Sequence, residues 1–205
     1  MGRRAKACDV SGMVDFAFSL QGRFVPSCYA RPLWEGICRV LPWLAEEPEA
    51  GLLPLRGHDQ GEGIWLPHRS KLVLRLPRTR AEEAQALCGA QIAVGTETLA
   101  VGQGELRPHR GYPTLHAAMV ASELDETAFH DQVRTDLATM GIGGQWICGR
   151  QRTLRDEVAP LHGFSLVVHH LTPSQSLQLQ GCGLGQARHL GCGIFVPYKS
   201  IPNLE

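Results

Sequence analysis

The chain has 205 residues, of which 43% are hydrophobic, and its 20 basic side chains balance 20 acidic ones. This composition is typical of a folded protein with a core, and it excludes disordered, collagen-like and uniformly basic chains. The sequence has neither an apolar run near the roughly 20 residues of a membrane span nor an export leader, so we expect a cytoplasmic protein.

The first half of the chain predicts one βαββαβ unit. Residues 1–12 are polar and basic, and we expect a frayed or disordered tail there. Alternating apolar side chains from Met13 to Leu20 indicate a half-buried strand. The elements that follow are a helix over 32–44 with its last turn tightened at Pro42, strands over 52–56 and 64–76, a helix over 80–88, and a strand at 91–94 or 98–101.

The second half repeats the same order of elements. Asp125 is positioned to cap a helix that ends at Met140, and Gly141 closes that helix. The remaining elements are strands over 114–121, 144–149 and 164–170, a helix from 172 or 174 to 180, and a last strand over 193–197. We therefore predict an α+β fold of two tandem ferredoxin-like (βαββαβ, RRM-like) domains, over residues 13–105 and 106–205.

The cysteine and arginine content indicates which kinds of binding site the chain can form. The seven cysteines show no Cys-x-x-Cys spacing and no zinc-finger grouping with histidine, so we expect reduced thiols, no metal and no cofactor. Of the 20 basic residues 17 are arginine, the side chain suited to forked phosphate contacts, although a GC-rich genome also produces this excess.

Basic residues gather in stretches without acids. Within residues 64–80 the even spacing of Arg69, Lys71 and Arg75 predicts that they share one face of a strand. Residues 143–155 carry Arg150, Arg152 and Arg155, and residues 158–204 contain no Asp or Glu. Each stretch alone could be an ordinary solvated face. Together they indicate a polarised surface for a nucleic acid, and we expect these six side chains to bind RNA.

A glycine-rich segment precedes the last predicted strand. Five of the 13 residues 181–193 are glycine, with Arg188 and His189 among them. Glycine permits close approach of backbone amides, so this segment is suited to binding a polyanion strand. The alternative is a flexible connection in which Gly181 caps the preceding helix. The predicted RNA contacts of this segment are Gly183, Gly185, Arg188, His189, Gly191 and Gly193.

The glycine spacing at 183–193, followed by Ile194-Phe195-Val196-Pro197, resembles the signature of the CRISPR-associated (Cas) family six, the repeat-specific endoribonucleases of the RAMP superfamily. Further similarity lies in Met13-Val14-Asp15, Leu41-Pro42-Trp43-Leu44 and Pro54-Leu55-Arg56-Gly57. The resemblance implies two ferredoxin-like domains that bind a CRISPR repeat RNA stem-loop, alone or beside other Cas subunits. It also implies metal-independent cleavage in which the 2′-hydroxyl attacks the phosphate.

That family usually carries a histidine near the first helix, and here this chain departs from it. Tyr29 stands at the helix start, Ala45 follows its end, and the first histidine is His58. Our acid/base candidates are therefore Tyr29 and His58, with Arg56 as the phosphate-binding cation and His189 in reserve. Tyr29 could instead be a core-edge residue and His58 a solvated one, so a non-catalytic RNA-binding subunit stays open, as does a less favoured small-molecule enzyme.

Overall fold

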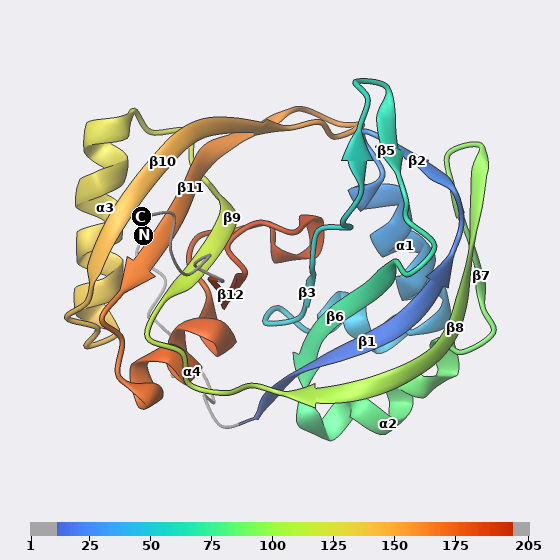
Figure 1. The fold of residues 1–205 in the computed structure, drawn as a ribbon, viewed down its shortest axis with the longest axis horizontal. Helices are drawn as coiled ribbons and strands as arrows, with labels where there is room; N and C mark the ends of the chain where they lie inside the picture. Colours follow the sequence, from blue (N-terminus) through green and yellow to red (C-terminus); the bar gives the residue numbers. More distant parts are fainter. Residues whose placement is uncertain (1–11, 199–205) are drawn as a thin grey trace, which may run out of the picture.

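Two antiparallel sheets, each covered by helices, lie side by side in the computed structural model, which describes residues 12–198 (Figure 1). All of the expected tail except Gly12 falls outside the described residues. Each sheet has its own apolar core. Within residues 12–198 every helix is too short or too polar for a transmembrane span.

The N-terminal unit has a five-stranded sheet in the order β3-β6-β1-β8-β7. Its strands are β1 (Met13–Gln21), β3 (Gly51–Leu52), β6 (Lys71–Pro77), β7 (Gln91–Val94) and β8 (Glu97–Pro108). Its helices are α1 (Ala30–Val40) and the short α2 (Ala81–Ala84), which is flanked by the 3-10 turns η2 (Arg78–Arg80) and η3 (Gln85–Leu87). Pro42 opens the 3-10 turn η1 (Pro42–Glu46), as its missing N–H predicts.

The long strand predicted over 64–76 is wrong. Ser70 N donates to Pro67 O in a turn that separates β6 from β5 (Gly63–Trp65). The β5 strand pairs instead with β2 (Phe24–Pro26) and β4 (His58–Asp59) in a small three-stranded sheet. Both alternatives for the last strand form, because Gly95 at φ +63° turns β7 into β8.

The C-terminal unit confirms every predicted element. Its sheet order is β10-β11-β9-β12. The elements are β9 (Leu115–Ala121), α3 (Glu126–Thr139), β10 (Gln145–Leu154), β11 (Leu161–His169), α4 (Pro173–Cys182) and β12 (Phe195–Pro197). Asp125 caps α3 by accepting from Ala128 N at 2.8 Å, and Gly141 ends that helix at φ +67°.

The strand orders also confirm the fold class. In each unit the first strand lies between the third and the fourth, and the second strand follows the third, which is the ferredoxin-like arrangement. In the N-terminal unit β7 is an additional edge strand beside β8. The first sheet ends at Pro108 and the second begins at Leu115.

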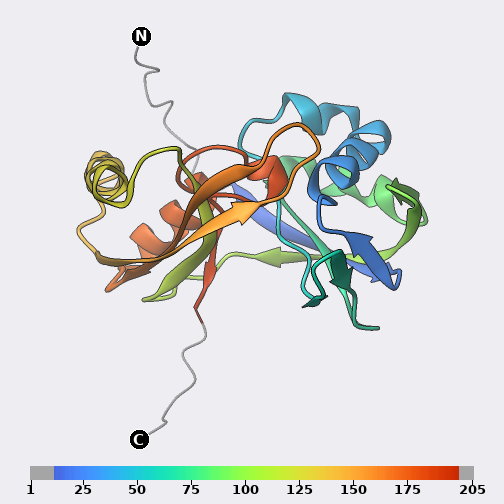
Figure 2. The ribbon, with the colours of Figure 1, turned by 90° about the horizontal axis from the view of Figure 1, so that it is seen from above.

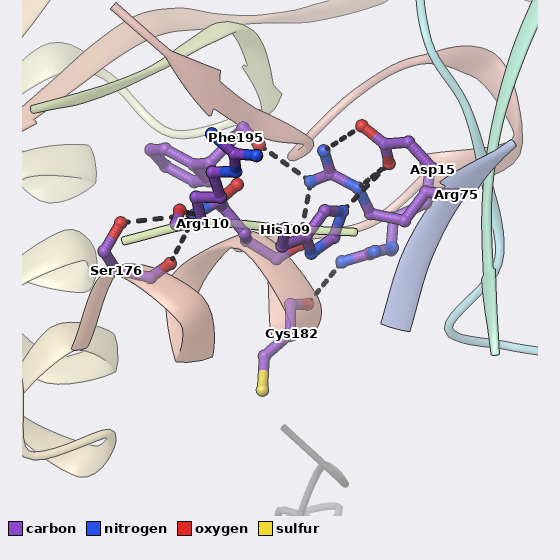
Figure 3. Close-up of polar contacts among 9 residues, drawn as sticks. Asp15, Arg75, His109, Arg110, Ser176, Cys182 and Phe195 are labelled. Atoms are coloured by element: carbon purple, nitrogen blue, oxygen red, sulfur yellow. Dashed lines mark hydrogen bonds and ion pairs between the residues drawn. The ribbon is translucent and has the colours of Figure 1, made fainter. Parts of the chain in front are cut away.

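A buried arginine joins the two units (Figure 3). Arg75 on β6 is fully buried and bonds Asp15 of β1 through Nε at 2.7 Å and Nη2 at 3.1 Å. Its Nη1 donates to Gln180 O at 2.8 Å and Phe195 O at 2.7 Å, both in the C-terminal unit. His109 Nε2 lies 3.0 Å from Asp15 Oδ1. This network fixes one sheet against the other.

The β10–β11 hairpin makes a second bridge, and Figure 2 shows its tip reaching α1. Asp156 at the tip accepts from Arg31 Nε at 2.9 Å and from Arg31 Nη2 at 2.6 Å. Arg155 donates to Gly61 O at 2.6 Å. The Arg31 hydrogen bond and charge hold the pKa of Asp156 below its usual value, against the effect of burial.

Candidate functional site

A groove of about 440 Å³ on the open face of the N-terminal sheet collects cationic side chains. Helices cover the opposite face, where Leu72, Leu74 and Leu76 are fully buried. Strand alternation therefore turns Lys71 toward the open face. The groove is lined by Asp15, Leu53, Pro54, Arg56, Pro67, Arg69, Ser70, Lys71, Val73, Arg107, Val196 and Pro197.

The groove brings together three residues predicted from the sequence: Arg56, Arg69 and Lys71, all exposed. Arg107 was missed, although it faces Asp15 across β1 and β8 and lies in the same wall. Arg107 donates a hydrogen bond to Glu105, two residues earlier in the chain. Because of this glutamate, Arg107 does not belong to any of the acid-free basic stretches that predict RNA contacts. The spacing of Arg107 and Glu105 on one strand face was the available signal.

Arg75 does not reach this groove. The even spacing correctly predicts that Arg75 shares a face of β6 with Lys71. The C-terminal unit, however, covers that end of β6. The backbone carbonyls of Gln180 and Phe195 accept hydrogen bonds from the Arg75 guanidinium group. A fully buried arginine paired with Asp15 is not available to a phosphate. The predicted RNA contact at Arg75 is therefore corrected to a structural role.

Tyr29 organises the segment that carries Arg56 and His58. Its side chain is buried, and its hydroxyl accepts a hydrogen bond from Leu55 N at 2.8 Å. Burial raises the pKa of Tyr29 to about 12, outweighing the opposite effect of the Leu55 hydrogen bond. The phenol therefore stays protonated near neutral pH, and it fixes the residue immediately before Arg56.

His58 lies on β4 and is exposed. Its neighbour Asp59 lines a cavity of about 460 Å³ together with Tyr29 and Ile64. His58 instead pairs in register with Trp65. Since successive residues of a strand point to opposite faces, His58 and Tyr29 lie toward different faces of the small sheet.

The predicted hairpin arginines have two different environments. Arg150 and Arg152 are exposed on β10. Arg155 is also exposed, but it bonds Gly61 O and lies 3.4 Å from Ser27 Oγ. The structure therefore leaves Arg150 and Arg152 as surface cations, whereas Arg155 helps to hold the hairpin on the N-terminal unit.

The glycine-rich segment folds mainly against itself. A Cβ on Gly193 would lie 1.9 Å from Leu184 O, and one on Gly183 would lie 2.3 Å from Gly193 O. Leu184 N also donates to Gly193 O at 3.1 Å. Gly183, Gly191 and Gly193 are buried, so the close approach that their backbones need is to this chain's own backbone.

The ends of this segment pack into different cores. Leu184 belongs to the C-terminal core and Leu190, in the 3-10 turn η4 (Arg188–Leu190), to the N-terminal core. Arg188 is buried and donates from Nη1 to Cys182 O at 2.5 Å. The expected RNA contact at Arg188 is thus corrected to a bond within the segment, while Gly185 remains exposed.

A second cavity, of about 620 Å³, separates the glycine-rich segment from η1. Its walls include His189, Gln186 and Gly185 on one side and Trp34, Ala45 and Glu47 on the other. His189 is half-buried, and its ring centroid lies 5.9 Å from that of Trp34. Burial and the nearby Arg31 lower the pKa of His189, and Asp156 opposes them.

Comparison with known proteins gives concordant matches. The family model described as Cas6 Crispr matches residues 14–200. The CRISPR-associated endonuclease Cas6 of Myxococcus xanthus (strain DK1622) is 31% identical over 186 residues, which are 90% of this chain and 81% of that protein.

Solved structures share the fold at lower identity. One, described as CRISPR associated protein Cas6, superposes with a TM-score of 0.62 at 13% identity, over 91% of this chain and 100% of that one. The product of a Cas6-related gene from Pyrococcus furiosus gives a TM-score of 0.64 at 13% identity, over 90% and 98% of the two chains.

Proposed function

Because the chain belongs to the Cas6 family of CRISPR-associated proteins, we propose that it binds CRISPR repeat RNA in the cytoplasm and cuts the precursor transcript into mature crRNA. The observation that carries the proposal is the cationic groove, one of whose arginines stands two residues before His58 in the chain. Arg56 lines that groove two residues before His58, and Arg69 and Lys71 extend it along the sheet. In this proposal the imidazole of His58 reaches the phosphate that Arg56 holds.

The reaction needs a proton acceptor, a proton donor and a cation. The 2′ oxygen forms a bond to phosphorus while the bond from phosphorus to the 5′ oxygen breaks, leaving a cyclic phosphate and a 5′-hydroxyl. Imidazole suits proton transfer near neutral pH, so His58 takes the 2′ proton or supplies the proton that the leaving oxygen needs. Arg56 neutralises the charge that develops on the non-bridging oxygens.

Tyr29 acts in this proposal as a positioning residue. Its burial, its raised pKa and the bond from Leu55 N favour a role in fixing the backbone before Arg56 over proton transfer. Gly57 supports the same geometry, because a Cβ there would lie 2.3 Å from Trp65 O. Arg56 and His58 are thereby held on a tightly packed segment.

The binding residues divide by exposure. Arg69, Lys71, Arg150 and Arg152 are exposed and bind RNA phosphates in this proposal. Gly185 and His189 line the second cavity, and in this proposal they contact another part of the bound RNA. The buried members of the glycine-rich segment shape it without touching RNA.

The test is cleavage of a labelled CRISPR repeat RNA in EDTA. We expect the wild-type protein to cut, and a 2′-deoxy substitution at the cut position to stop cleavage. His58→Ala and Arg56→Ala should each lower the single-turnover rate by about 100-fold or more. His170→Ala, which removes another exposed histidine, is the matched control and should cut normally.

Other outcomes are equally informative. Tight, salt-sensitive binding without cleavage by the wild-type protein would support the non-catalytic RNA-binding subunit. A wild-type protein with no affinity for RNA at physiological salt would overturn both proposals.

A further inference from the structure

Three rings form a row across the small three-stranded sheet. Phe24 on β2 pairs with Trp65 on β5, and Trp65 pairs with His58 on β4. Residues directly opposite each other on antiparallel strands share a face, so the three side chains are neighbours. The ring centroids of Phe24 and Trp65 lie 5.4 Å apart at 57°.

This row faces outward. On the opposite face of the same strands Val25 is fully buried and Ile64 packs against the N-terminal core. Trp65 is 46% exposed and His58 is exposed. The indole therefore contributes little to the core, although an exposed tryptophan of this size usually marks a contact surface.

Segments just outside β4 and β5 connect the row to the cationic groove. Arg56 stands two residues before His58, and Pro67 stands two residues after Trp65; both line the groove. A strand of RNA held by its phosphates at Arg56 and Arg69 therefore passes the edge of the aromatic row. An unpaired base turned from that strand meets the face of Trp65.

The charged side chains around Trp65 favour binding of a nucleobase over binding of a phosphate. The surface beside it forms a shallow cavity of about 540 Å³, lined by Arg23, Phe24, Gln60, Glu62, Gly63, Trp65 and Glu97. Two carboxylates next to one guanidinium group repel a phosphate chain. Carboxylates instead accept hydrogen bonds from exocyclic amino groups, and an aromatic face stacks on any base.

We infer that Trp65 and Phe24 form a stacking platform for an unpaired, amino-bearing nucleobase of the bound RNA, beside the nucleotide at His58. This inference rests on the proposed function, and it names the part of the substrate that the platform holds. Stacking there fixes the nucleotide next to the scissile phosphate and so positions the 2′-hydroxyl. Trp65 is a positioning residue in this scheme, not a catalytic one.

The experiment compares a base-bearing polyanion with a base-free one. Binding of an adenosine decamer and of inorganic polyphosphate is titrated with the full-length protein and its variants. Trp65→Ala should weaken decamer binding about tenfold or more and leave polyphosphate binding unchanged, and Trp65→Phe should restore most of the loss. Ile147→Ala, which truncates another exposed apolar side chain, is the matched control.

Fluorescence gives a second reading on folded protein. The decamer should quench wild-type tryptophan emission more strongly than that of Trp65→Phe, and polyphosphate should quench neither. Equal decamer affinity for wild type and Trp65→Ala, or equal loss for both polyanions, would overturn the inference. So would self-association that Trp65→Ala abolishes while RNA binding is retained, since the row would then be a protein interface.

Failure of this inference is distinguishable from failure of the proposed function. If the wild-type protein cuts repeat RNA and Trp65→Ala cuts it with unchanged KM and kcat, only the stacking platform is lost. If the wild-type protein neither binds nor cuts repeat RNA, both proposals fail.

Discussion

The Tyr29 hydroxyl accepts a hydrogen bond from Leu55 N at 2.8 Å and so ties the start of α1 to the segment that carries Arg56 and His58. Both groups are buried, and the phenol has a pKa of about 12. The bond therefore fixes the segment at the edge of the cationic groove relative to α1.

Tyr29→Phe separates positioning from proton transfer. The substitution keeps the ring but leaves the buried Leu55 N–H without an acceptor, which should lower the free energy of unfolding by about 1–3 kcal/mol. We expect the single-turnover cleavage rate to fall about tenfold, less than in His58→Ala, with RNA affinity retained. Chemical denaturation and single-turnover kinetics check both. A loss of rate equal to that of His58→Ala at unchanged stability would identify Tyr29 as a proton-transfer group.

Arg75 and Lys71 lie on the same face of β6 and should behave in opposite ways. Arg75→Met removes a fully buried guanidinium group and leaves the half-buried Asp15 carboxylate without its cation, so it should cost about 3–5 kcal/mol of unfolding free energy. Lys71→Met should leave stability within about 0.5 kcal/mol but weaken RNA binding and reduce its salt dependence by about one counterion. Denaturation and salt titration of binding measure the two. A stable Arg75→Met protein with weakened RNA binding would restore the sequence-based prediction.

The pH dependence of stability should report the same network. Burial alone would raise the pKa of Asp15, but the charge of Arg75 and hydrogen bonds from His109 and Arg75 outweigh it and hold the pKa far below its usual range. A carboxyl with a depressed folded-state pKa stabilises the fold above its unfolded pKa, about 3.9, and the stabilisation disappears as pH falls below that value.

Urea denaturation between pH 7 and pH 3 tests this expectation. The wild-type free energy of unfolding should fall steeply below about pH 4, and Asp15→Asn should be less stable at pH 7 but lose less on acidification. Asp131→Asn removes an exposed carboxylate on α3 and serves as the control, with a profile close to wild type. Parallel profiles for Asp15→Asn and wild type would contradict the assignment.

Local signals in the sequence predicted the C-terminal unit well. Asp125 and Gly141 act within a few residues of the helix that they bound, so no distant partner can overrule them. The predictions that failed depend on distant contacts. Parity places Arg75 on the correct face, but only the packing of α4 and β12 shows that this end of β6 is covered. Pro67 and Ser70 form a turn that apolar periodicity alone does not indicate.

The glycine-rich segment illustrates the same limit at the site. Its composition correctly indicates that its backbone lies very close to another group, but it does not indicate whether that group belongs to RNA or to the protein itself. The structure supplies this chain's own carbonyls, those of Leu184 and Gly193, where the sequence suggested ribose-phosphate. The Trp65 row was equally hidden, because register between β2, β5 and β4 cannot be deduced from three short strands.

Gly193→Ala distinguishes a glycine that is needed for packing against the protein's own backbone from one that is needed for RNA contact. At φ +67° with a carbonyl oxygen 1.9 Å from the new Cβ, the variant should lose at least about 2 kcal/mol of unfolding free energy. Gly143→Ala is the control, since nothing beyond its chain neighbours lies within 4 Å of an added Cβ, and it should be neutral or slightly stabilising. Thermal unfolding measures both. A Gly193→Ala protein of normal stability that loses RNA affinity would show that the segment contacts RNA directly.

The β10–β11 hairpin depends on Asp156 for its position over α1. The Asp156 side chain is 3% exposed and receives a forked bond from Arg31, whereas Arg155 adds one bond to Gly61 O. Asp156→Ala should therefore cost about 1.5–3 kcal/mol, the range for hydrogen bonds to charged groups.

Hydrogen exchange locates that loss. We expect faster amide exchange over residues 150–161 in Asp156→Ala, with α3 and its core unchanged, because the hairpin loses an anchor at its tip while β9 still pairs with β11. Glu157→Ala, one residue along the chain and exposed, should exchange like wild type. Since the same hairpin carries Arg150 and Arg152, release of its tip should also weaken RNA binding severalfold. Unchanged exchange in Asp156→Ala would mean that strand pairing alone holds the hairpin across the two units.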